Sequence, residues 1–175
     1  MELKRVVVTG IGALTPIGNT YQEYWEGLKN GVSGAAPITL FDATLFKTQF
    51  ACEVKNFNIE DHFDRKEARK IDRCAQLGIV AAREAIGHSR ILDDANVNKE
   101  RIGVIWGSGI GGIKTFEEEV SNFATGNGIP RFNPFFIPKM IADITPGHIS
   151  MEFGLMGPNY TCLLYTSPSP RDATL

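Results

Sequence analysis

The chain has 175 residues, of which 43% are hydrophobic and 22% are charged, and its formal net charge is −2. These values are typical of a globular protein with room for one domain. The nearly neutral charge provides no overall field that would gather nucleic acid or an anionic membrane, so neither is expected as a partner.

The cysteines and the N-terminus give no sign of export, metal binding or membrane insertion. Cys52, Cys74 and Cys162 are odd in number and widely spaced, and no pair has the short spacing of a zinc site. We therefore expect no metal and a reducing compartment, the cytoplasm. The three N-terminal valines are followed by polar Thr9, and no run approaches the ~18 apolar residues of a membrane span.

The N-terminal part of the chain predicts a strand, a turn and a helix. Residues 6–8 are consecutive valines, a pattern typical of a strand buried on both faces of a sheet. Asn19 or Thr20 can cap the helix that follows, and Gly31 suits the left-handed residue after its end at about Asn30. A loop is expected over residues 32–48, and residues 50–54 suit a short strand.

The most regular helical pattern lies in the middle of the chain. Apolar residues recur three or four positions apart from Ala68 to Ile86, and Asp64 is placed to cap them. One continuous helix is therefore expected from Asp64 onward.

The remaining elements follow the order strand, glycine loop and helix. Residues 102–106 predict a second buried strand, which ends in a glycine cluster at 107–112 and is followed by a helix from about residue 113 to 124. A rigid apolar segment lies at 133–138, and another helix is expected over 145–153. Strands that alternate with helices indicate an α/β fold with a largely parallel sheet.

Two glycine-rich segments could bind a phosphate. Residues 9–18 follow a predicted strand and precede a helix, but a dinucleotide fingerprint needs a glycine where this chain has Thr15. The cluster at 107–112 could hold an anion on backbone amides, or could allow close approach of the backbone to another chain or a ligand. The sequence alone leaves both roles of this cluster open.

Taken together, six ordered motifs resemble the N-terminal half of the β-ketoacyl-[acyl-carrier-protein] synthases, and the type II condensing enzymes of fatty acid synthesis are the most similar. The motifs are residues 6–12, 16–18, 65–70, 107–112, 133–138 and 157–158. The resemblance covers residues 1–161 and implies a thiolase-like α/β fold, the first half of an αβαβα sandwich with a mixed, mainly parallel sheet. It makes residues 1–161 an incomplete N-terminal domain.

The resemblance also implies a reaction. Such enzymes take an acyl group from acyl carrier protein onto a cysteine, decarboxylate malonyl carrier protein and join the two carbon units, as homodimers and without a cofactor. A helix N-terminus would lower the pKa of that cysteine and stabilise the oxyanion. Counting from Gly157 places the cysteine at position 166, where this chain has Thr166. Cys162 lies four positions too early, so no catalytic residue is expected in this chain.

The histidines do not replace the missing groups. In this family two histidines and a lysine from the second half complete the catalytic site, and His62, His88 and His148 match none of them. We expect His148 to be structural and His62 and His88 to lie on the surface.

Other family positions are present. Lys66, Arg69 and Lys70, hereafter the docking cations, match the residues that meet the acidic helix of acyl carrier protein, and their spacing would place them on one helix face. Ile110 matches a residue of the acyl-chain pocket. Phe136 matches a dimer-interface residue that closes the neighbouring subunit's pocket. Without the resemblance, the cations would be read as a solvated helix start and Phe136 as core.

The C-terminal segment, residues 162–175, departs from the family pattern. Two prolines within three residues cannot continue a central strand or begin the nucleophile helix. The segment is similar to translated adapter DNA, and we expect it to be artefactual or disordered.

Three functions remain open from the sequence. The first is an inactive fragment of a condensing enzyme, and the second is a non-catalytic module for carrier-protein docking or dimerisation. The third is a nucleotide-dependent oxidoreductase, which Thr15 weakens.

Overall fold

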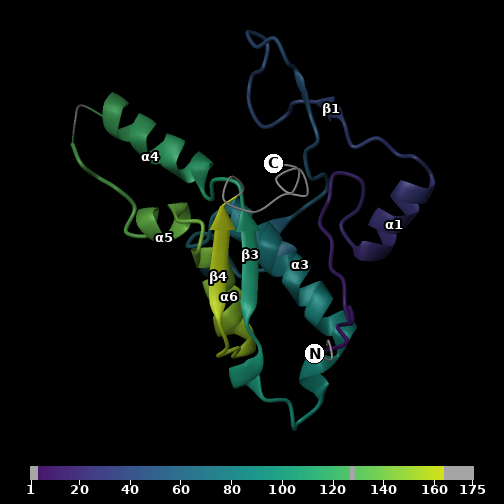
Figure 1. Cartoon of the computed structure of the whole chain (residues 1–175). Helices are drawn as coiled ribbons and strands as arrows, with labels where there is room; N and C mark the ends of the chain where they lie inside the picture. Colours follow the sequence, from purple (N-terminus) through teal and green to yellow (C-terminus); the bar gives the residue numbers. More distant parts are fainter. Residues whose placement is uncertain (1–3, 127–128, 164–175) are drawn as a thin grey trace, which may run out of the picture. The chain divides into compact units, whose positions relative to one another are not determined.

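The computed structural model describes residues 4–126 and 129–163 (Figure 1). The chain divides into two compact units, one made of Met1–Ile59 with Val80–Ala95 and the other of Glu60–Ile79 with Asn96–Leu175. No helix in the described ranges is both long and apolar enough to cross a membrane.

In the first unit, the predicted helix is confirmed and the predicted strand is wrong. Helix α1 spans Tyr21–Lys29, with Thr20 accepting a hydrogen bond from the backbone N–H of Glu23, and Gly31 follows it with φ of +63°. Residues 6–8 form no strand, and Val6 is 90% exposed. Three valines favour a strand but cannot form one without a neighbour, and no described strand pairs with them.

The strands that do form in this unit are short. Strand β1 (Ala36–Pro37) pairs with β2 (Phe50–Ala51) in antiparallel orientation, with Ala36 opposite Ala51. The expected strand over residues 50–54 is therefore present but ends at Ala51. The unit also contains the larger part of helix α3 (Arg73–Ser89) and the 3₁₀ turn Ile91–Asp93.

Gly10 and Gly12 lie directly against helix α3. A Cβ atom added at Gly12 would lie 1.9 Å from the carbonyl oxygen of Ala81, and one at Gly10 would lie 2.1 Å from that of Ala85. The two glycines therefore allow backbone to pack on backbone, which a larger residue would prevent.

We expect Gly12→Ala to lower the free energy of unfolding by about 3 kcal/mol, because the collision is with helix backbone and not with a movable side chain. Gly87→Ala is the matched control, since Gly87 lies in the same helix with no atom within 4 Å of its added Cβ. The control should be neutral or stabilising, because alanine is the better helix former. Urea denaturation of both variants tests this, and an unchanged midpoint for Gly12→Ala would contradict it.

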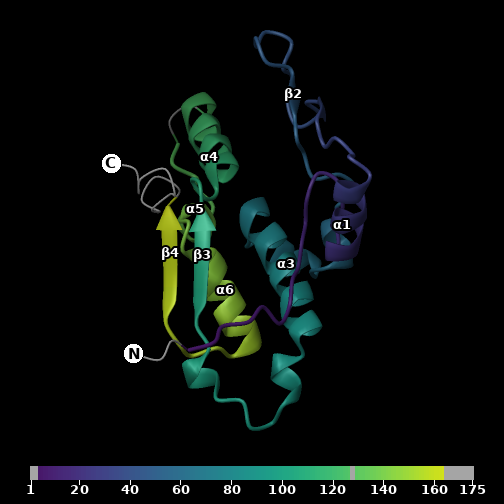
Figure 2. The same cartoon turned by 45° about the vertical axis from the view of Figure 1, so that its right-hand side comes forward.

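The second unit is built on two parallel strands. Strand β3 (Val104–Ser108) pairs with β4 (Asn159–Leu163), with Trp106 opposite Thr161. Helix α6 (Ile144–Phe153) lies along this pair (Figure 2). Ile105 and Tyr160 are 81% and 65% exposed. Parallel strands are normally covered on both faces, so this pair carries apolar side chains that the described residues leave uncovered.

The single helix predicted from Asp64 onward is wrong, because the chain forms two helices there. Asp64 caps the short helix α2 (Arg65–Ala68), and α3 begins only at Arg73. The carboxylate of Asp72 accepts a hydrogen bond from the backbone N–H of Cys74 at 2.9 Å. Asp72 thereby caps a new helix, which interrupts the apolar periodicity without changing its spacing.

The other helices follow the sequence more closely. Helix α4 spans Ile113–Thr125, and α6 ends at Phe153 and is followed by Gly154 with φ of +65°, so the two predicted helices are confirmed. The short helix α5 (Phe136–Met140) begins inside the apolar segment at 133–138 and runs two residues past it. The helix tolerates Pro138 because the N–H of a first-turn residue needs no partner in the helix.

Candidate functional site

The backbone amides around the first glycine segment are already occupied by side chains of helix α3. The two carboxylate oxygens of Glu84 accept hydrogen bonds from the N–H groups of Ala13, at 2.8 Å, and Tyr21, at 2.9 Å. The Nδ1 atom of His88 accepts the N–H of Ile11 at 3.1 Å, and its ring stacks on Tyr21 with centroids 4.4 Å apart. An internal carboxylate thus satisfies amides that a nucleotide phosphate would need, which argues against the oxidoreductase hypothesis.

The second glycine cluster brings two helices together. Gly112 donates its N–H to the carbonyl of Met140 at 3.0 Å, and an added Cβ there would lie 2.2 Å from the carbonyl oxygen of Lys139. Gly111 has φ of +95°, which disfavours other residues. The close approach seen here is within the chain, between the start of α4 and the end of α5, whereas the sequence suggested approach to another chain or a ligand.

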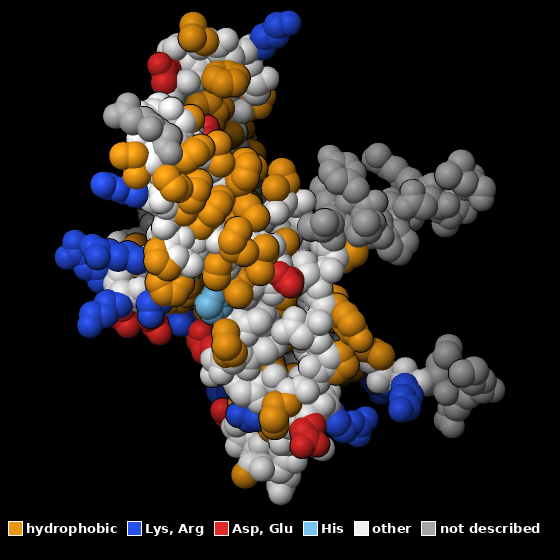
Figure 3. Space-filling view, turned by 90° about the vertical axis from the view of Figure 1, so that its left-hand side faces the viewer, with side chains coloured by type: hydrophobic (Ala, Val, Ile, Leu, Met, Phe, Trp, Pro, Cys, Tyr) orange, Lys and Arg blue, Asp and Glu red, His pale blue; other side chains and the backbone are white. Residues whose placement is uncertain are grey.

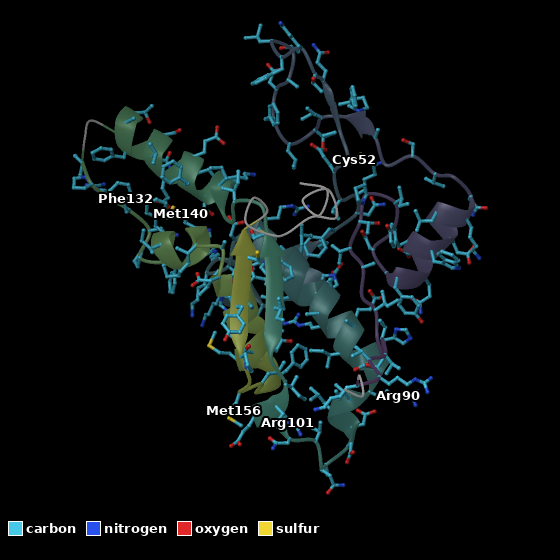
Figure 4. All side chains as sticks on the ribbon, in the orientation of Figure 1. Cys52, Arg90, Arg101, Phe132, Met140 and Met156 are labelled. Atoms are coloured by element: carbon cyan, nitrogen blue, oxygen red, sulfur yellow. The ribbon has the colours of Figure 1, made fainter. Side chains whose placement is uncertain are left out.

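That approach forms an apolar cavity of about 390 Å³, hereafter the apolar cavity. It is lined by Ile110, Ile113, Phe116, Met140, Ile141 and Ala142. Met140 and Phe132 mark this side of the molecule in Figure 4. A cavity of this size and lining suits a hydrocarbon chain. Ile110, singled out from the sequence, is in the lining.

Phe136 lies behind this lining. Its ring stacks on Phe116, with centroids 6.3 Å apart, and on Phe132, at 5.7 Å. Phe136 therefore supports a wall of the apolar cavity from the second layer in this chain.

The docking cations are exposed and belong to the same unit as the apolar cavity. Lys66 lies in α2, whereas Arg69 and Lys70 lie in the turn between α2 and α3. The expectation that all three share one helix face is wrong, because the helix ends at Ala68. The ammonium of Lys70 lies 5.6 Å from the centre of the Phe135 ring, a cation–π contact. Figure 3 shows hydrophobic side chains gathered on one face, with basic side chains at its edge.

The same unit holds a buried polar pair, Asp72 and Thr115, which no motif in the sequence indicates. Asp72 is 7% exposed, and its second carboxylate oxygen accepts a hydrogen bond from the hydroxyl of Thr115, in the first turn of α4, at 2.5 Å. Burial raises the pKa of the Cys74 thiol, and the charge of Asp72 raises it further, while a hydrogen bond with Ser108 opposes both. The only sequence signal for this pair was the preference of aspartate for helix N-caps.

We expect iodoacetamide at pH 8 to label Cys74 at least about tenfold more slowly than Cys52, because burial and a raised pKa both reduce reactive thiolate. Cys52 is exposed. Mass spectrometry of the labelled protein measures the two rates, and labelling in urea should bring them together. Equal rates in the native protein would contradict the partial burial of Cys74.

The histidines and the remaining cysteine are not among the residues that line the apolar cavity. His62 and His88 are exposed, as expected. His148 lies in α6, where burial lowers its pKa although nearby Glu152 and Glu67 act in the opposite direction. Cys162 lies in β4, opposite Gly107. Thr166 lies outside the described residues. Within the described ranges, no three His, Cys, Asp or Glu side chains are grouped so that they could hold a metal ion.

Comparison with known proteins agrees with the resemblance seen in the sequence. Residues 3–163 match the family model "Beta-ketoacyl synthase, N-terminal domain". The chain is 48% identical over 157 residues to 3-oxoacyl-[acyl-carrier-protein] synthase 2 of Staphylococcus aureus (strain COL), an alignment that covers 89% of this chain and 37% of the relative. The chain thus spans little more than a third of that protein.

Solved structures show the same fold. The ishigamide ketosynthase/chain length factor superposes with a TM-score of 0.75 at 27% identity, over 90% of this chain and 39% of that chain. A type II PKS acyl-carrier protein in complex with its ketosynthase gives a TM-score of 0.71 at 27% identity, over 94% of this chain and 42% of that one. The predicted thiolase-like α/β fold is confirmed, and the chain belongs to the β-ketoacyl synthase family, as its N-terminal domain.

Proposed function

We propose that this chain supplies the carrier-docking surface and part of the acyl-chain pocket of a 3-oxoacyl-[acyl-carrier-protein] synthase. The complete enzyme would elongate acyl chains by decarboxylative condensation with malonyl carrier protein in fatty acid biosynthesis. One observation carries the proposal: exposed docking cations and the apolar cavity occur in one compact unit, linked by the hydrogen bond between Asp72 and Thr115.

The two features suit the two parts of an acylated carrier protein. The cations Lys66, Arg69 and Lys70 complement an acidic helix, and such charge complementarity steers association. The apolar cavity, lined by Ile110 and Phe116, suits the hydrocarbon chain that the carrier delivers. The ketosynthase relative solved with an acyl carrier protein supports this partner.

We propose that the 175-residue chain does not catalyse condensation by itself. Thr166 occupies the position at which the family has its cysteine, and the chain spans about 37% of its Staphylococcus aureus relative. We further propose that residues 1–161 are the family domain and that the sequence from residue 162 onward departs from it. Strand β4 includes Cys162 and Leu163, so the ordered strand runs two residues past that boundary.

A non-catalytic module for carrier docking or dimerisation is the second candidate. The docking cations and Phe136 are the residues that such a module would keep. The exposed apolar residues Ile105 and Tyr160 favour burial against another surface, either a second copy or the remainder of a longer protein.

Calorimetric titration of the full chain with acyl carrier protein tests the proposed function. We expect binding that weakens as salt concentration rises, and tighter binding of an octanoyl carrier than of the carrier without an acyl group. Absence of binding by both forms at low salt would overturn the proposal. Equal affinity for the two forms would leave docking but remove the role of the apolar cavity.

A further inference from the structure

The turn that carries Arg69 and Lys70 is anchored by a buried amide. Gln76, in the first turns of α3, is 9% exposed. Its side-chain nitrogen donates two hydrogen bonds of 3.0 Å, one to the carbonyl of Ala68 and one to the carbonyl of Ile71. These two acceptors bracket Arg69 and Lys70 in the chain, so one side chain holds both ends of the basic turn.

This anchor has a clear physical role. The last carbonyls of helix α2 lack partners within a helix that ends at Ala68, and such groups are costly to bury unpaired. The amide of Gln76, in the next helix, supplies a donor to the carbonyl of Ala68, the last residue of α2, and a second donor to the carbonyl of Ile71 in the turn. Two donors fixed on one rigid side chain also restrict the backbone between their acceptors.

A second buried side chain, that of Asp72, also fixes the C-terminal end of the turn. The carboxylate of Asp72 accepts hydrogen bonds from the N–H of Cys74 and the hydroxyl of Thr115, and these bonds connect the turn to α3 and to α4. Lys70 in addition lies over the ring of Phe135. The positions of two docking cations are therefore set by groups that are themselves buried.

We propose that Gln76 is a positioning residue for recognition of the carrier protein, with Asp72 and Thr115 as its supporting pair. This inference rests on the proposed function. Gln76 would not touch the partner; it holds Arg69 and Lys70 in the arrangement that the acidic helix meets, so that little conformational entropy is lost on binding.

Loss of the Gln76 anchor should affect different rate constants from loss of a docking cation. Removing a cation weakens electrostatic steering, which lowers the association rate and the dependence on salt. Loosening the turn leaves the charges in place, so the association rate and its salt dependence should hardly change. The complex should instead dissociate faster, because the contacts are less well ordered.

The test is surface plasmon resonance of the full chain with octanoyl acyl carrier protein, well below the unfolding temperature. Gln76→Met keeps the length of the side chain but removes both donors, and we expect about a tenfold faster dissociation with an association rate within twofold of wild type. Lys66→Ala should instead lower the association rate and its salt dependence, with a dissociation rate close to that of wild type. Asn159→Leu is the control, since its amide also donates two hydrogen bonds, to Pro146 and Ser150.

Hydrogen exchange of the unliganded protein provides a second readout. Gln76→Met should speed exchange in residues 68–72 and leave α6 unchanged, whereas Asn159→Leu should do the reverse. If Gln76→Met does not fold, Thr115→Val and Thr115→Ser decide, since only the serine keeps the hydroxyl that Asp72 accepts. Thr115→Val should speed dissociation, and Thr115→Ser should dissociate at about the wild-type rate.

The outcomes separate the two proposals. No binding by the wild type would overturn the proposed function, and this inference with it. If the wild type binds and Gln76→Met dissociates at the wild-type rate, the inference alone is overturned. If Gln76→Met does not fold, an unchanged dissociation rate in Thr115→Val has the same meaning. Equal acceleration by Asn159→Leu would also overturn it, because the effect would then be general loss of stability.

Discussion

Charge reversal at Lys66 and Arg69 together is expected to weaken binding of acyl carrier protein by at least about 100-fold. Each substitution, Lys66→Glu and Arg69→Glu, replaces an attraction by a like-charge repulsion, and such juxtaposition costs several kcal/mol. A 100-fold loss of affinity corresponds to about 2.8 kcal/mol of binding free energy, which is less than two such repulsions could cost. Calorimetry at low salt measures it.

The matched control reverses two cations elsewhere. Lys47→Glu with Arg101→Glu changes the net charge by the same amount, and both residues are exposed. Arg101, labelled in Figure 4, lies in the 3₁₀ turn Lys99–Arg101, outside the α2–α3 region. We expect the control to retain affinity within about threefold, because neither reversed cation belongs to the proposed docking surface and salt screens interactions between exposed charges that are not in contact. Equal losses in both doubles would show that only net charge matters, and docking through α2 would be abandoned.

The 175-residue chain is expected to form no 3-oxoacyl product from octanoyl and malonyl carrier proteins. On the proposed function, condensation would need a cysteine thiolate at position 166 together with groups that polarise the thioester and promote decarboxylation. Removing one member of such a set abolishes most of the rate, and removing the others then adds little. Mass spectrometry of the carrier-bound products, with the full-length Staphylococcus aureus relative as positive control, is the measurement.

A second variant makes this expectation sharper. Thr166→Cys alone should also form no product, because a thiol without its partner groups is not activated. Product from the unmodified chain above the buffer rate would contradict the proposed assignment of the cysteine position. Product from Thr166→Cys only would show that the first part of the fold suffices for condensation.

Local signals in the sequence predicted local structure well. The pair Asn19 and Thr20 predicts the start of helix α1 and Gly31 its end; the structure assigns the cap to Thr20 and gives Gly31 the left-handed conformation, because capping involves groups only a few positions apart. The strand at residues 6–8 failed for the opposite reason. Its formation depends on a neighbouring strand, and the valine pattern contains no information about whether that neighbour is present.

The central helix shows how a periodic pattern can hide a break. Apolar spacing continues through residues 69–72, yet Asp72 turns to the first N–H groups of α3 and to Thr115, and Gln76 reaches back to the carbonyls of Ala68 and Ile71. Thr115 lies 43 positions from Asp72. Such partners are set by tertiary packing, so the docking cations could be named from the sequence but their arrangement could not.

The candidate site was likewise only partly visible beforehand. Ile110 was identified by position in a motif, and the structure places it in the lining of the apolar cavity. The other lining residues come from α4, α5 and the residues after α5, and became neighbours only because Gly111 and Gly112 let two backbones meet. A run of glycines permits such an approach but does not identify the segment that makes it.

The uncovered side chains of the β3–β4 pair have a consequence for how longer relatives are made in the cell. This part of the family is synthesised first, and the rest of the Staphylococcus aureus relative is more than half of its length. At roughly 5–20 residues per second, a ribosome needs on the order of tens of seconds to complete the remainder. Apolar residues exposed as Ile105 and Tyr160 are in this chain would face water during that interval, and such surfaces are prone to aggregate before the rest of the protein is made.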